Sequence, residues 1–188
     1  MKTLRFKICM LIVGLLLTVV PRAEAGLLGD TINWQYYAYG GAYNNLGSPG
    51  SFVAGSTSSG FGGYFDLSAN NSQIIFNYSS STAWSASGVS LNSGGLYIEN
   101  GILLTDSANT FTGVSINPLT NMSGFSLSNV TFNSNNIAIN WAGLPFDSNT
   151  WVVLNVNTPS SAVPEPSTFL LLGSGIAGLA LVRRFRNK

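Results

Sequence analysis

Carboxylates are the side chains in the middle of this 188-residue chain that could do acid–base chemistry. Hydrolysis of a glycosidic bond needs two of them, one as the acid and one as the base or nucleophile. A pair drawn from Glu99, Asp106 and Asp147 could serve in this way. Each also has a structural interpretation, because Glu99 precedes a predicted turn, Asp106 closes a predicted strand and Asp147 suits an Asx-turn. We expect no enzyme, since glycosidase sites usually also use His, Arg or Lys.

Calcium binding is a second use for acidic side chains that stand close to amides. Asp147 with Asn149, and Asp30 with Asn33, offer oxygen ligands of the kind that calcium prefers. Neither pair has the dense acidic spacing of an EF-hand loop. We therefore expect no cofactor, with calcium at Asp147 and Asn149 as a weak alternative.

Basic and histidine side chains are absent from residues 26–162, whose five acids are Asp30, Asp66, Glu99, Asp106 and Asp147. A region with this charge of −5 would be repelled by nucleic-acid phosphates. A serine nucleophile would lack a His or Lys base, a Schiff base would lack its amine, and zinc would lack His and Cys ligands. The one cysteine, Cys9, lies near the N-terminus, so this region has no thiol chemistry.

The N-terminus has the three parts of a secretory signal peptide, which are a basic segment, an apolar segment and a small-residue cleavage site. In order, these parts are Lys2, Arg5 and Lys7, then residues 8–20, then Ala23 and Ala25. An apolar run of this length covers about 20 Å, too little for a hydrocarbon core of roughly 30 Å. We expect residues 1–25 to direct the chain to the secretion translocon and to be removed after Ala25.

The C-terminus repeats this arrangement in reverse, with a polar linker at residues 159–168, an apolar segment at 169–182 and a basic tail at 183–188. The tail contains Arg183, Arg184, Arg186 and Lys188. These residues should halt transfer and stay cytoplasmic, which leaves the middle of the chain outside the inner membrane. We expect residues 169–182 to form a single transmembrane helix of marginal length, about 21 Å. A permanently anchored single-pass envelope protein is an alternative.

The order of motifs at this end resembles a known sorting signal. The linker ends in Val163-Pro164-Glu165-Pro166-Ser167-Thr168, a glycine-containing apolar segment follows, and Arg183-Arg184 come next. Together they look like the PEP-CTERM sorting signal. The resemblance implies a Gram-negative bacterium and a membrane exosortase that recognises the signal and cuts near Pro164–Pro166. It also implies export linked to exopolysaccharide or biofilm matrix, and says nothing about the middle of the chain.

The middle of the chain alternates apolar and polar residues with the period of β-strands. Half-buried strands are predicted at residues 73–78, 136–141 and 151–156, and further strands at 34–39, 51–54, 62–67, 111–116, 124–128 and 130–132. A hairpin is predicted at Asn100-Gly101, with Ile98 opposite Leu103, because a two-residue turn of this type suits Asn and Gly. We expect an all-β body over residues 26–158, an antiparallel β-sandwich or a jelly-roll-like fold.

Aromatic residues are frequent in this body, which argues against disorder. The segment Trp34–Tyr39, followed by Tyr43, could present rings to sugar faces, although core packing is the favoured interpretation. Edge strands usually carry Lys to block association between sheets, and the body has none, so self-association is a hypothesis.

These features predict an exported surface or extracellular protein with a structural or adhesive role in exopolysaccharide or biofilm. The expected partners are the translocon, an exosortase-type enzyme and exopolysaccharide, with no nucleic acid. A secreted protein that binds or hydrolyses glycans is the alternative function.

Overall fold

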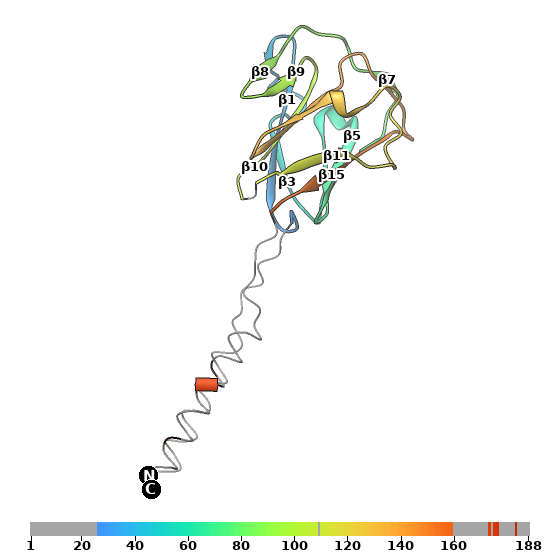
Figure 1. Cartoon of the computed structure of the whole chain (residues 1–188). Helices are drawn as coiled ribbons and strands as arrows, with labels where there is room; N and C mark the ends of the chain where they lie inside the picture. Colours follow the sequence, from blue (N-terminus) through green and yellow to red (C-terminus); the bar gives the residue numbers. More distant parts are fainter. Residues whose placement is uncertain (1–25, 109, 160–172, 174, 177–182, 184–188) are drawn as a thin grey trace. The chain divides into compact units, whose positions relative to one another are not determined.

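Alternation of apolar and polar side chains produces strands with one buried face. Figure 1 shows the computed structural model, which describes residues 26–108, 110–159, 173, 175, 176 and 183. On the first strand, β1 (Thr31–Ala38), the side chains of Ile32, Trp34 and Tyr36 are buried, whereas Asn33 is exposed. Successive side chains on a strand point to opposite faces, so this pattern directs one face toward the core.

The larger sheet has six strands in the order β12-β13-β10-β1-β2, with β3 also paired to β1. All its neighbouring strands are antiparallel. Besides β1, its members are β2 (Gly41–Ala42), β3 (Gly50–Val53), β10 (Gly101–Asp106), β12 (Val130–Phe132) and β13 (Asn136–Asn140).

The second sheet has five antiparallel strands in the order β11-β15-β6-β5-β4. Its members are β4 (Thr57–Ser59), β5 (Phe65–Ala69), β6 (Gln73–Tyr78), β11 (Gly113–Ile116) and β15 (Trp151–Asn157). Strands β6 and β15 occupy the middle of this sheet, and their inward side chains are almost entirely buried.

Two short strand pairs and two 3-10 helices complete the described body. The elements are β7 (Thr82–Ala83) with β14 (Pro145–Phe146), β8 (Leu91–Ser93) with β9 (Leu96–Ile98), η1 (Phe61–Gly63) and η2 (Leu127–Asn129). No α-helix occurs within residues 26–108 and 110–159.

One hydrophobic core joins the inward faces of both sheets. It includes Trp34 from β1, Ile102 from β10, Phe76 from β6 and Leu154 from β15. The two sheets therefore pack against each other as layers, as apolar sheet faces must in order to leave water. The predicted all-β class with antiparallel sheets is confirmed.

The predicted hairpin at Asn100-Gly101 is wrong. Strand β9 pairs with β8 across a two-residue turn, so that Ile98 lies opposite Leu91 and not Leu103. The turn residues are Gly94 and Gly95, both with positive φ as a type I′ turn requires. The side chain of Ile98 packs in a small apolar cluster, and Leu103 packs against that cluster from β10.

Gly101 serves close strand packing instead of a turn. Its neighbour across the sheet is β13, and a Cβ at position 101 would lie 1.9 Å from the backbone oxygen of Ile139. The glycine that suggested a turn is therefore required by the approach of two backbones.

The strand predicted at residues 124–128 is also wrong, because this segment contains a turn and the start of η2. Ser126 and Asn129 form a reciprocal capping box there, which favours a helical turn over a strand. The other predicted strands overlap observed strands, and those at 73–78 and 130–132 have the predicted bounds.

The predicted signal peptide, residues 1–25, lies outside the described residues, as does almost all of the predicted transmembrane segment at 169–182. Of that segment, the structure describes residues 173, 175 and 176, which are helical. Among the described residues, no helix has the length and apolar character needed to cross a membrane.

Candidate functional site

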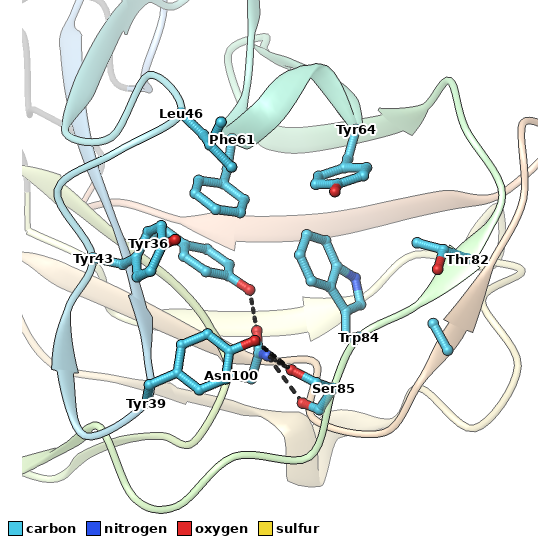
Figure 2. A pocket seen from close by; sticks show the side chains of 11 residues that line it. Tyr36, Tyr39, Tyr43, Leu46, Phe61, Tyr64, Thr82, Trp84, Ser85 and Asn100 are labelled. Atoms are coloured by element: carbon cyan, nitrogen blue, oxygen red, sulfur yellow. Dashed lines mark hydrogen bonds between the residues drawn. The ribbon is translucent and has the colours of Figure 1, made fainter.

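A pocket of about 260 Å³ opens between β1, η1 and the segment that follows β7 (Figure 2). Six of its residues are aromatic, and none of the described residues that line it is charged. The lining residues are Tyr36, Tyr39, Tyr43, Leu46, Phe61, Tyr64, Thr82, Ala83, Trp84, Ser85 and Asn100. They come from segments far apart in the sequence, so the pocket exists only once the two sheets have packed.

Buried rings form the inner wall of the pocket. Tyr36 stacks on Phe61 with ring centroids 3.7 Å apart and planes 7° from parallel. On the side toward the core, Trp84 stacks on Trp141 at 5.3 Å, and its indole N–H donates to the Tyr78 hydroxyl at 3.4 Å. These contacts hold the wall rigidly, because each ring is locked by its neighbours.

A polar network crosses the base of the pocket. The Tyr36 hydroxyl donates to the side-chain oxygen of Asn100, whose amide donates at 2.9 Å to both the backbone and the side-chain oxygen of Ser85. The Tyr39 and Ser85 hydroxyls are 3.2 Å apart. Figure 2 shows both tyrosine hydroxyls pointing toward Asn100 and Ser85. Burial raises the pKa of Tyr36 well above its usual value, so this hydroxyl stays protonated.

Two exposed side chains stand at the mouth of the pocket. Tyr39 is 70% exposed and Leu46 is 51% exposed. Tyr43 and Tyr64 are half-buried and extend the aromatic wall outward. The pocket therefore offers apolar ring faces around a polar base, open on one side to solvent.

The acids proposed for glycan hydrolysis lie elsewhere. Glu99, Asp106 and Asp147 are not among the residues that line the pocket. Glu99 accepts a hydrogen bond from the Tyr97 hydroxyl, and this contact raises the pKa of Tyr97. Asp106 is fully buried at the end of β10 and accepts from the backbone N–H of Ala108 at 2.8 Å. Each carboxylate thus has a local structural partner.

Asp106 does lie near a second acid, but not one of the predicted pairs. The pKa of Asp30 is raised, first by its partial burial and then by the negative charge of Asp106. Asp30 directly precedes β1. Ile32, two residues further on, pairs with Asp106 across the sheet. The approach of the two acids follows from strand register.

The predicted Asx-turn at Asp147 is confirmed. Its Oδ1 accepts from the backbone N–H of Asn149 at 2.8 Å and from the Thr150 hydroxyl at 3.1 Å. This carboxylate oxygen therefore serves the turn before β15. Among the described residues, no group of three acidic, His or Cys side chains could hold a metal ion.

The predicted sorting and processing residues fall outside the described residues, with one exception. These residues are Ala23, Ala25, Val163, Pro164, Glu165, Pro166, Ser167, Thr168, Arg184, Arg186 and Lys188. Arg183 is described and is exposed in a helical conformation.

The sequence singled out one aromatic segment of the pocket but predicted no pocket, because core packing was the favoured interpretation. The aromatic segment that it singled out supplies Tyr36, Tyr39 and Tyr43, and it also supplies Trp34, which is buried in the core. Trp84 and Asn100 were missed as pocket residues. No local signal marks them, because they reach the pocket through pairing of β7 with β14 and of β10 with β1.

Comparison with known proteins defines the C-terminal region. The chain carries a C-terminal sorting signal, since residues 162–184 match the model of a protein-sorting motif. That motif is the PEP-CTERM protein-sorting motif, so the resemblance noted in the sequence is confirmed. The motif is recognised by exosortase and implies export with membrane-associated sorting in Gram-negative bacteria. No curated protein and no solved structure matches the chain.

Proposed function

We propose that this chain is a non-enzymatic protein of the extracellular matrix, exported and then retained among exopolysaccharide as a structural or adhesive component. The PEP-CTERM motif at residues 162–184 is the observation that carries the proposal. A signal of this kind directs its carrier outward, so the β-sheet body is the part that would act outside the cell.

The charge of the body supports an adhesive role over a catalytic one. Residues 26–162 contain five acids and no Lys, Arg or His, which leaves few groups for acid–base or nucleophilic catalysis. The acids Glu99 and Asp106 are engaged in contacts within the fold. Hydrogen bonds and ring faces remain as the means by which the body would hold a partner.

The sheet edges support self-association within a matrix. Strands β4 and β11 are the two ends of the five-stranded sheet, and β12 ends the larger one. The body has no Lys to place on these edges, and lysine is a usual device for keeping sheets apart. Association of bodies side by side would suit a protein that builds a layer.

Substitution of the Pro-Glu-Pro motif tests the proposal. In the producing bacterium, we expect the wild-type chain to be recovered with extracellular polysaccharide, and a chain with Pro164, Glu165 and Pro166 replaced by Ala to stay with the cell membrane. Intact mass measured on both forms shows whether either terminus has been cut. As a control, Asn44→Gly alters an exposed body residue and should not change the distribution.

Two results would contradict the proposal. Equal recovery of the wild-type and substituted chains in every fraction would show that the Pro-Glu-Pro motif does not sort the chain. Recovery of the wild-type chain in the soluble medium, separate from the extracellular polysaccharide that the same cells produce, would contradict the matrix role.

A further inference from the structure

We infer that the aromatic pocket binds one neutral pyranose ring of a glycan chain. The inference deepens the proposed adhesive role and rests on it, because it names the chemical class that the body would hold. Its support comes from the pocket alone, through the charge of its lining, the shape of its walls and the backbone conformation at its mouth.

The uncharged lining selects a neutral ligand. None of the described residues that line the pocket is acidic or basic. A uronate or phosphate group entering this site would lose water without gaining a cationic partner, which is costly. Hydroxyl groups, in contrast, match the exposed hydroxyl of Ser85, which the buried Asn100 amide holds in place at 2.9 Å. A sugar with hydroxyls and no charge fits this chemistry.

The ring faces select a flat, partly apolar ligand. Aromatic faces carry negative partial charge, so they attract the weakly positive C–H groups on a sugar's apolar face. Tyr39, Tyr43 and Tyr64 line the pocket with such rings, and none of the three is fully buried. The volume of about 260 Å³ lies just below the ~300–1,000 Å³ typical of pockets for drug-sized ligands. One ring fits inside, and the rest of a chain would extend into solvent.

Two residues at the mouth of the pocket have a strained backbone conformation, which indicates a role other than packing within the fold. Among the described residues, two non-glycine residues have a positive φ, Tyr39 at 54° and Leu46 at 52°. Both line the pocket, and both are exposed. A bulky residue is disfavoured in this conformation, where Gly or Asn is the usual choice.

Neither residue recovers this cost by burial, because each leaves at least half of its surface in water. Strained conformations of this kind concentrate at functional sites. Tyr39 stands at the turn between β1 and β2, where Ala38 pairs with Gly41, and its ring lies 6.2 Å from that of Tyr43. The strained turn thus holds an exposed ring beside the pocket, where a bound sugar would cover it.

Calorimetric titration with cellohexaose tests the inference. Its β-linked glucose rings are neutral, and their equatorial hydroxyls leave apolar C–H groups on both faces. The full chain is used in a zwitterionic detergent without a sugar head group, so that detergent does not compete. We expect saturable binding, at least tenfold weaker binding of oligogalacturonate of the same length, and no binding of the acyclic polyol sorbitol.

Two matched variants assign the binding to the pocket. Tyr39→Asn removes the exposed ring at the mouth and should weaken cellohexaose binding about three- to tenfold. Phe132→Asn removes a ring that is 40% exposed on β12, outside the pocket, and should leave the affinity unchanged. Both positions are at the surface, so both variants should fold, and circular dichroism checks this.

The inference is overturned by the absence of saturable cellohexaose binding, by equal affinity of the wild-type chain and Tyr39→Asn, or by equal affinity for oligogalacturonate. These outcomes are separate from failure of the proposed function. A chain that is sorted and retained normally but binds no glycan overturns the pocket assignment alone. A chain that binds cellohexaose but is not sorted overturns the proposed role and leaves the pocket in place.

Discussion

The hydroxyl of Tyr36 donates a hydrogen bond to the side-chain oxygen of Asn100, a residue 64 positions later in the chain. Asn100 is 2% exposed, and its amide group donates in turn to Ser85. The bond ties the end of β1 to the start of β10, two strands that are neighbours in the larger sheet. The Asn-Gly pair, whose type suggests a turn, is thus part of the base of a pocket.

Replacing Asn100 by Gly distinguishes these two roles. In a type I′ turn the substitution would be close to neutral, since Gly suits the same backbone conformation. Here it removes the Asn100 partner of the Tyr36 hydroxyl and of two Ser85 oxygens, so we expect a loss of about 1–3 kcal/mol in the free energy of unfolding. Urea denaturation measures this loss. The exposed loop variant Asn44→Gly should change stability by less than about 0.5 kcal/mol, and an equally small effect at position 100 would contradict our interpretation.

Adding a methyl group at Gly101 should force two strands apart. The new Cβ would lie 1.9 Å from the Ile139 backbone oxygen, a contact that side-chain movement cannot relieve. We expect Gly101→Ala to lower the free energy of unfolding by about 1–3 kcal/mol or more. Gly88→Ala is the control, since a Cβ there has nothing within 4 Å. If thermal melting shifts equally in both variants, the close approach of β10 and β13 is not what requires glycine.

Relieving the strained turn at Tyr39 should make the body more stable. Asn tolerates positive φ better than Tyr, and the tyrosine ring is mostly exposed, so Tyr39→Asn should raise the free energy of unfolding by about 0.5–1 kcal/mol. Tyr39→Phe keeps the strain and should show no such gain. Denaturation midpoints of the two variants, compared with the wild-type chain, decide the matter. A destabilised Tyr39→Asn would show that the ring contributes more to folding than its backbone costs.

Alkaline pH should destabilise the body through its buried tyrosines. Burial raises the pKa values of Tyr36 and Tyr78 above the usual 10.0, so the folded state keeps protons that the unfolded state releases. The stability that the two protonated tyrosines contribute is therefore fully present below pH 10.0, and it is lost as the pH rises above that value. Urea denaturation at several pH values between 8 and 12 should show this fall, and Tyr78→Phe should make it less steep. If the free energy of unfolding of the wild-type chain does not change over this range, the pKa values of Tyr36 and Tyr78 are not raised by folding.

Several features of the protein follow from local patterns in the chain. The period-two alternation at residues 73–78 predicts a strand because neighbouring side chains must point to opposite faces, and β6 has those bounds. The C-terminal motif is likewise readable without a fold, since a sorting signal is recognised as a short segment, and residues 162–184 match it. The absence of cations from the body is a matter of composition alone.

Strand pairing and the pocket depend instead on contacts between distant residues. Two adjacent turn signals, Gly94-Gly95 and Asn100-Gly101, both fit a hairpin locally. The first forms the turn, because β9 then places Leu96 and Ile98 in an apolar cluster with Ala138 of β13 and frees Gly101 to approach that same strand. Tyr36, Phe61 and Trp84 also meet only through contacts between segments that are distant in the sequence. Burial of apolar surface is gained only when whole sheets pack, so no short window of residues carries the information that brings them together.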